Sequence, residues 1–170
     1  MSMINRKLES RFEAVRKDAH YRPIIDQVKA KAGTGASSDQ VLKAAVCATR
    51  DQFKREGKTA SDHTLREQAF LAAAAASMEK PMTLSDLPEG EDKTKHFLTS
   101  GFLSLTIAKW ADKVLPRGLA EKVGTGASIA LGWGKEVYDK FFATGFNRED
   151  LQADIAGAKR PFDMKLEDCK

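Results

Sequence analysis

The sequence predicts an all-α protein, a compact bundle of about seven or eight helices. The chain is rich in Ala, Leu, Lys and Glu, which favour helices. No segment shows the period-two alternation of polar and apolar residues that is typical of β-strands. With 170 residues, the chain is long enough to bury a core as one domain, or as an N-terminal helical module beside a C-terminal one.

The N-terminal half is expected to form four helices. The first carries one apolar stripe at helical spacing, made by Ile4, Leu8, Phe12 and Val15. Pro23 can open a second helix over residues 24–32, which ends at the Gly33-Thr34-Gly35 segment.

A capping-box pattern at Ser37 and Gln40 begins the third helix, and Gly57 ends it. The fourth begins at Ser61 or Asp62 and is rich in alanine. So many small residues predict close approach to neighbouring helices.

The C-terminal half is expected to form three helices, over residues 93–110, 128–143 and 148–157. Residues 114–118 interrupt the pattern after the first, Gly145 stops the second, and Asn147 can cap the third. Two similar heptapeptides, KAGTGAS at Lys31 and KVGTGAS at Lys122, are interpreted as two Gly-rich breaks and not as a repeat.

Pro and Gly residues with acidic neighbours indicate one linker, residues 81–91. We therefore expect an N-terminal helical region over residues 1–80, a C-terminal helical module over 92–158 and a tail over 159–170.

The net charge of +4 arises in the N-terminal half, where helical faces exposed to solvent account for it. Basic runs interleaved with aromatic residues are absent, so no nucleic-acid partner is expected. The two cysteines, Cys47 and Cys169, have no metal-ligand spacing, which excludes a zinc module. Cys47 is expected to be a small core residue, and a disulfide with Cys169 requires an oxidising compartment.

No apolar segment is long enough to span a membrane; the nearest, residues 97–108, is short and interrupted by polar residues. The first twenty residues lack the apolar region of a secretory signal. We therefore expect a cytoplasmic protein that makes at most peripheral membrane contact. The alternative is delivery to the envelope or the exterior by a dedicated secretion system.

Polar or small residues recur every three or four positions on the three C-terminal helices, so each helix carries one such stripe. They are Asp92, His96, Ser100 and Ser104; Ser128, Gly132 and Glu136, with Asp139 close by; and Asp150, Asp154 and Gly157.

If the stripes converge, His96, Glu136, Asp139 and Asp154 form a candidate catalytic site. Such a group could hold a divalent metal, or a carboxylic acid with a raised pKa could share acid–base work with the histidine.

Each candidate also has a structural interpretation. His96 can be a hydrogen-bonded core histidine, Asp150 can cap its helix, and Asp92 can be an N-cap. Glu136 can pair with Lys140, and Asp139 with Lys135. The remaining histidines, His20 and His63, are expected at the surface.

Three motifs in order, D-K-x-x-H-F at Asp92, G-x-x-K-E-x-Y-D at Gly132 and D-x-x-x-D-x-x-G at Asp150, resemble the YfiM-like predicted periplasmic lipoproteins. The layout is also similar to that of the VanZ-like membrane proteins. The resemblance covers Asp92 to Gly157. It implies an envelope location and a shared polar site at Lys93, His96, Glu136, Asp139 and Asp154, in a family without a settled function.

We therefore expect a non-enzymatic helical binding or scaffold protein with a protein partner, in which His96, Glu136 and Asp139 form a buried network that fixes helix register. The partner would dock on an apolar groove of the helix over residues 65–78. The alternatives are a metal- or acid–base-assisted hydrolase of an envelope component, such as lipid or peptidoglycan, and a secreted effector.

Overall fold

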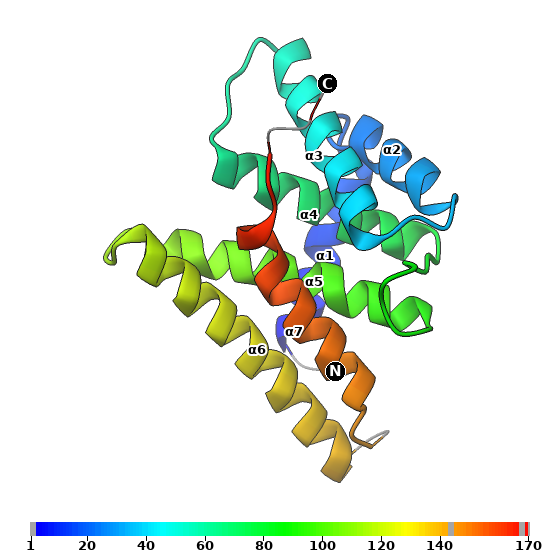
Figure 1. The fold of residues 1–170 in the computed structure, drawn as a ribbon, viewed down its shortest axis with the longest axis vertical. Coiled ribbons are helices and arrows are strands. Elements are labelled where there is room, and N and C mark those ends of the chain that lie inside the picture. The colour runs from blue at the N-terminus through cyan, green and yellow to red at the C-terminus, as the bar shows by residue number, and fades with distance from the viewer. Residues whose placement is uncertain (1–2, 143–144, 167–168, 170) are drawn as a thin grey trace. The chain divides into compact units, whose positions relative to one another are not determined.

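Seven helices and no strands make up the described part of the computed structural model, residues 3–142, 145–166 and 169 (Figure 1). Side chains are described for these residues except 3–6, 139, 141 and 142. The helices are α1 (Met3–Lys17), α2 (Arg22–Ala32), α3 (Ser38–Arg55), α4 (Asp62–Glu79), α5 (Glu91–Ala111), α6 (Arg117–Phe142) and α7 (Arg148–Asp163). The all-α prediction is confirmed.

The chain divides into two units, described separately below. The first consists of Met1–Asp86 together with Leu166–Lys170, and the second of Leu87–Lys165. The chain therefore leaves the first unit after α4 and returns to it after α7. Helix α7 extends to Asp163, with Pro161 inside it, and so is longer than the predicted helix that ends at Gly157.

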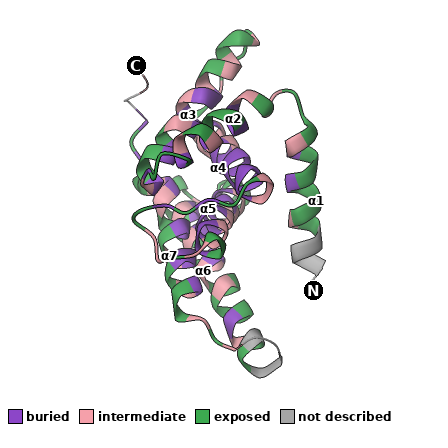
Figure 2. Ribbon diagram, turned by 90° about the vertical axis from the view of Figure 1, so that its right-hand side faces the viewer, coloured by how far each residue is buried: buried purple, intermediate pink, exposed green. Residues whose placement is uncertain are grey.

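In the first unit, α4 is the central helix and packs against α1, α2 and α3. Its alanines from Ala72 to Ala76 are all buried, as Figure 2 shows by colour. Alanine leaves room for three neighbouring helices to approach closely, which explains the Ala-rich sequence. The prediction of an exposed apolar groove on residues 65–78 is wrong, because these alanines form the core of the unit.

Side-chain caps begin the next helices as the sequence predicts. Ser37 and Gln40 make a reciprocal capping box at α3, and Ser61 accepts a hydrogen bond from the Thr64 N–H at α4. Asp86 then ties the end of the unit back to α3, because its carboxylate accepts bonds of 2.6 Å from both the backbone N–H and the hydroxyl of Ser38.

A disulfide joins Cys47 on α3 to Cys169. The sequence left this pairing as an alternative to a free core cysteine, and the structure contains it. The Arg50 side chain also donates to the backbone carbonyl of Leu166, at 2.8 Å. Two contacts therefore attach the C-terminal residues to α3 within the first unit.

In the second unit, α5 packs against both α6 and α7. Glycines allow these close contacts. A Cβ on Gly157 of α7 would overlap the Phe97 carbonyl of α5, and one on Gly124 of α6 would overlap the Ser104 carbonyl. Hydroxyls complete the contact: Ser128 donates to the Ser100 carbonyl at 2.8 Å.

Helix α6 begins at Arg117 and not at Ser128 as predicted. The Gly124-Thr125-Gly126 segment, interpreted as a break, lies inside the helix because Gly124 is needed for the contact with α5. None of the described helices is both long and apolar enough to cross a membrane.

Candidate functional site

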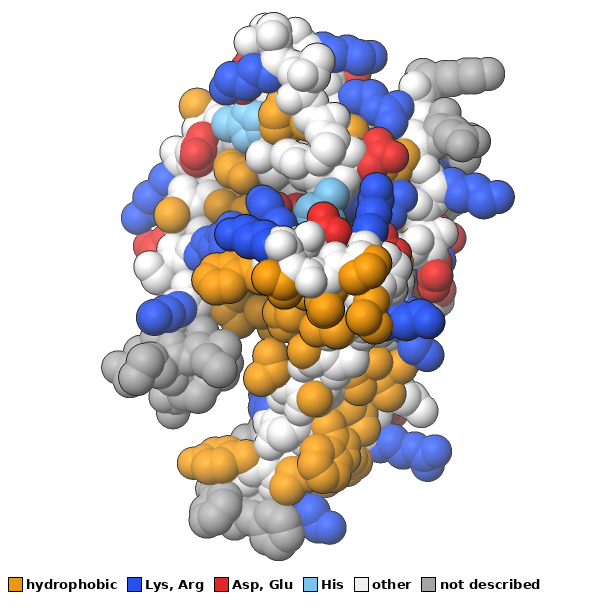
Figure 3. Space-filling model, turned by 90° about the vertical axis from the view of Figure 1, so that its left-hand side faces the viewer, with side chains coloured by type: hydrophobic (Ala, Val, Ile, Leu, Met, Phe, Trp, Pro, Cys, Tyr) orange, Lys and Arg blue, Asp and Glu red, His pale blue; other side chains and the backbone are white. Residues whose placement is uncertain are grey.

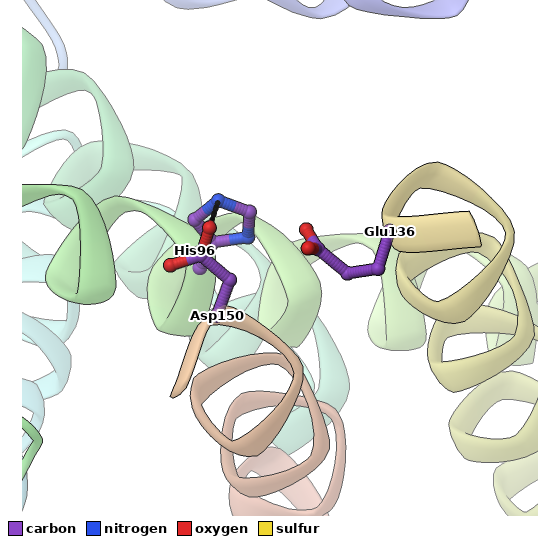
Figure 4. Close-up of side chains that lie close together, drawn as sticks. All are labelled: His96, Glu136 and Asp150. Atoms are coloured by element: carbon purple, nitrogen blue, oxygen red, sulfur yellow. Dashed lines mark ion pairs between the residues drawn. The ribbon is translucent and has the colours of Figure 1, made fainter. Parts of the chain in front are cut away.

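Helices α5, α6 and α7 bring a cluster of charged side chains together, as the polar stripes predict. Helix α5 supplies Lys93 and His96, α6 supplies Glu136, and α7 supplies Asp150 and Asp154. In Figure 4 the Glu136 carboxylate extends from α6 toward His96 and Asp150. We call these five residues the polar cluster.

His96 lies between the two aspartates of α7. Its Nδ1 is 3.2 Å from Asp154 Oδ1, and its Nε2 is 3.5 Å from Asp150 Oδ2. Burial by itself would lower the pKa of His96, but the hydrogen bond and charge of Asp154 and the charge of Asp150 outweigh it, so the pKa is raised. The site therefore favours the imidazolium, which can donate to both carboxylates.

Lys93 is the second cation of the polar cluster. Its ammonium group is 2.6 Å from Asp150 Oδ1 and 2.7 Å from Asp92 Oδ2, and the residue is only 4% exposed. Burial would lower the pKa of Lys93, but the hydrogen bonds and charges of the two aspartates raise it overall. The same hydrogen bond with Lys93 lowers the pKa of Asp92.

Glu136 is almost completely buried, with 1% of its surface exposed. One carboxylate oxygen accepts from the Lys135 ammonium group at 3.0 Å, and the other accepts from the backbone N–H of Asn147 at 2.9 Å. Asn147 is the N-cap of α7, and its side chain accepts from the N–H groups of Glu149 and Asp150. Glu136 therefore holds the start of α7 against α6.

This arrangement differs from the capping role expected for Asp150. In a capping box, the residue at N3 accepts from the N–H of the N-cap. Here Glu136 accepts from the Asn147 N–H, while the Asp150 carboxylate faces Lys93 and His96. Asp92 is not the N-cap of α5, because Gly90 occupies that position with a φ of 131°.

Asp154 lies directly against the backbone of α6. A Cβ added to Gly132 would come 2.5 Å from Asp154 Oδ2, so this aspartate fits only because residue 132 is glycine. The structure thus brings together three of the four predicted residues, His96, Glu136 and Asp154. The side chain of the fourth, Asp139, lies outside the described part of the chain.

Residues that the stripe analysis missed also contribute. Lys93 was indicated only by the family resemblance, since its position between two polar stripe residues gives no periodic signal. In the first unit, His20 is half-buried and not at the surface as expected: Nδ1 is 2.6 Å from Glu56 Oε1 and Nε2 is 2.8 Å from Gln68 Oε1. Hydrogen bonds from Lys58, His20 and Gln52 lower the pKa of Glu56 to about 2.

Two features bear on what the polar cluster can do. His96, Glu136 and Asp150 each offer one ligand atom, all within 4.8 Å of one another, a ligand set that suits a divalent cation. A hollow of about 550 Å³ lies next to them, lined by Asp92, Glu136, Asn147, Glu149 and Asp150 among others. His96 is not among the described residues that line it.

No protein-family model matches the chain, and no curated protein or solved structure matches it. The resemblance to YfiM-like and VanZ-like proteins therefore stays a prediction.

Proposed function

We propose that the chain is a non-enzymatic helical binding protein whose polar cluster is structural. One observation carries this proposal: the reactive groups of the cluster interact with one another and with the backbone. His96 lies between Asp150 and Asp154, Lys93 contacts Asp150, and Glu136 accepts bonds from Lys135 and Asn147. A histidine or carboxylate that acts in catalysis needs at least one hydrogen-bonding position available for its substrate.

A satisfied buried network has a structural use. It favours one relative arrangement of its helices, because any slip leaves buried charges without partners, and removing one member of a buried pair costs about 3–5 kcal/mol. In this chain the network fixes α7 through Asp150, Asp154 and the Asn147 N–H, while Glu136 fixes the end of α6. The cluster then serves to present the outer surface of these helices to a partner.

The second candidate is a metal-assisted hydrolase of an envelope component, favoured by the ligand set and the adjacent hollow. In this alternative, His96, Glu136 and Asp150 bind a divalent cation after the His96 proton has left. The five acidic groups at and around the site, Asp92, Glu136, Glu149, Asp150 and Asp154, outnumber the three lysine and arginine side chains, Lys93, Lys135 and Arg148, which also favours a cation.

Thermal unfolding with and without Zn²⁺, Mn²⁺ and Mg²⁺ distinguishes the two candidates. The chain, His96→Gln and Glu136→Gln are compared, with His20→Gln as the matched control, since His20 is also half-buried beside a carboxylate. We expect both cluster variants to melt well below the unchanged chain, and no metal to raise any melting temperature.

A metal-dependent rise in the unchanged chain and in His20→Gln, absent from both cluster variants and larger at higher pH, would contradict the structural role. Variants that melt at or above the unchanged chain would also contradict it, because groups held for catalysis commonly reduce stability.

The disulfide supports a location in an oxidising compartment, in place of the cytoplasmic location expected from the sequence. Alkylation of the protein from its native source, followed by mass spectrometry without reduction, tests this. The proposal requires Cys47 and Cys169 to remain unlabelled until a reductant is added.

A further inference from the structure

Helix α6 turns its apolar side outward. Among the described residues, every large apolar side chain that is exposed lies between Trp110 and Phe146, and five of them are on α6. Those five are Leu119, Val123, Leu131, Trp133 and Tyr138. Figure 3 shows apolar side chains gathered along this helix, with basic side chains beside them.

The spacing of the residues explains this orientation. The buried or partly buried side of α6 consists of small and polar residues every four positions: Ala120, Gly124, Ser128, Gly132 and Glu136. These contact α5 and α7 through the glycine, serine and carboxylate interactions described above. The opposite side carries Leu119, Val123, Gly126, Ala130 and Trp133, spaced three or four apart, and the exposed residues Leu131 and Tyr138 lie along one margin of it. No charged residue occurs in residues 123–134. We call this side the outer face of α6.

Such a face is unusual on a soluble protein. Exposed apolar residues scattered singly need no explanation, whereas a continuous stripe indicates an interaction surface. The stripe extends from Leu119 to Tyr138, which at about 1.5 Å per residue is roughly 30 Å. Trp110 and Val114, at the end of α5 and in the turn that follows, are 72% and 82% exposed and add apolar surface beside it.

Basic residues border the outer face on both sides. Because successive residues turn by about 100°, Lys122 and Lys140 fall along one edge and Arg117 and Lys135 along the other. All four are exposed. Lys113, in the turn before α6, lies 5.8 Å from the centre of the Trp110 ring. Arg117 pairs with Glu121 at 3.1 Å and Lys135 with Glu136 at 3.0 Å, so two of these positive charges already have a carboxylate partner. The five basic residues still outnumber these two carboxylates and the exposed Asp112, which favours an anionic partner.

We propose that the outer face of α6 binds an anionic lipid surface, with the helix lying in the plane of the interface. The composition fits this occupant: leucine, valine and tryptophan on one side and lysine and arginine along the edges are typical of interfacial helices. Tryptophan and tyrosine favour the boundary between lipid and water, and lysine side chains reach the headgroups while their methylene groups lie over apolar surface. This proposal extends the binding function above but does not involve the polar cluster.

The same charges argue against a second copy of the chain as the occupant. In a two-fold symmetric dimer, the outer face meets itself, so the basic edges of one protomer lie beside those of the other. Like charges held close together are unfavourable. An anionic surface neutralises both edges at once.

Intrinsic fluorescence gives a direct test, because the chain has only two tryptophans, Trp110 and Trp133, and both are exposed in this region. The full chain is titrated with phosphatidylcholine vesicles with and without phosphatidylglycerol. We expect a blue shift of the emission and protection from acrylamide with the anionic vesicles, both weakened by added salt.

Leu131→Glu and Gln152→Glu form a matched pair. Each adds one negative charge at an exposed position of the second unit, but Gln152 lies on α7. We expect Leu131→Glu to weaken vesicle binding by at least about tenfold. The substitution removes a leucine side chain that would insert into the lipid, and it adds a negative charge. Gln152→Glu should bind like the unchanged chain, and circular dichroism should show both variants folded.

Three results would overturn the proposal: no fluorescence change with anionic vesicles, equal weakening in the two variants, or equal binding to both vesicle types. Analytical ultracentrifugation could instead show that the chain dimerises with increasing concentration and that Leu131→Glu does not. If the chain also binds no vesicles, that result would assign the outer face to a second copy. Binding of a protein ligand that is lost in Leu131→Glu, in a chain that binds no vesicles, would assign the outer face to a protein partner.

Discussion

Helices α4 and α6 use their apolar residues in opposite ways. Helix α4 is surrounded by α1, α2 and α3 and buries its alanines. Helix α6 buries glycine, serine and glutamate against α5 and α7, and exposes leucine, valine, tryptophan and tyrosine. The apolar residues of α4 pack into the core of the first unit. Helix α6 instead packs against its neighbours in the second unit through small and polar residues. The large apolar residues of α6 are therefore available for a partner.

The largest expected difference comes from adding a charge to each helix. Ala72→Glu puts a carboxylate into the fully buried centre of α4 and should cost more than about 4 kcal/mol of unfolding free energy, through overpacking and desolvation. Leu131→Glu on the outer face of α6 should change stability by less than about 0.5 kcal/mol. Urea denaturation monitored by circular dichroism measures both, and similar losses would remove the contrast between the helices.

Reduction of the disulfide should act on the unit that contains α4. The Cys47–Cys169 bond closes a separation of 122 residues. Its loss should cost about 2–4 kcal/mol, because the unfolded chain regains conformational freedom. The free energy of unfolding is compared with and without dithiothreitol, with Cys47→Ser as the control that should not respond to it. This prediction would be contradicted if the unsubstituted chain had the same free energy of unfolding with and without dithiothreitol.

Two glycines test the inner and outer sides of α6 within one turn. Gly124→Ala should cost about 1–3 kcal/mol, since its Cβ would overlap the Ser104 carbonyl. Gly126→Ala should stabilise the chain by up to about 1 kcal/mol, because no atom lies within 4 Å of the new Cβ and alanine favours helix. Thermal or urea unfolding measures both changes in stability. An increase in stability for Gly124→Ala would mean that this side of α6 does not pack closely against α5.

The smallest effect is a pH dependence that arises in the polar cluster. The raised pKa of His96 means that its contribution to stability is fully present below the unfolded value, near pH 6.5, and is lost as the pH rises through the folded pKa. Asp150 and Asp154 favour the charged form, and Lys135 opposes it.

The unfolding free energies of the unchanged chain and of His96→Gln should therefore approach one another as the pH rises above about 6.5. A difference between the chain and His96→Gln that grows with pH would contradict the raised pKa.

Much of the fold could be predicted because local signals dominate it. The capping box at Ser37 and the cap at Ser61 are short-range patterns, and the four-residue spacing of His96, Glu136 and Asp154 with their neighbours indicated the faces that meet. The helical class followed from composition and from the absence of period-two alternation.

What could not be predicted depends on distant contacts. The heptapeptides at Lys31 and Lys122 both contain Gly-Thr-Gly, yet the first ends α2, with Gly35 at a φ of 70°, and the second continues α6. Glycine is favoured at position 124 of the helix because Ser104 and Ala108 of α5 leave no room for a side chain there. The contacts of Lys93, the disulfide and the outward direction of the α6 apolar stripe likewise depend on which helix lies opposite.

The most direct test places the same leucine on each side of α6, two residues apart, as Ser128→Leu and Ala130→Leu. Ser128 is 2% exposed and its hydroxyl donates to the Ser100 carbonyl, whereas Ala130 is exposed. Urea denaturation should show a loss of about 2–4 kcal/mol for Ser128→Leu and a change below about 0.5 kcal/mol for Ala130→Leu. A larger loss at Ala130 than at Ser128 would mean that the apolar side of α6 is buried, and would contradict the account.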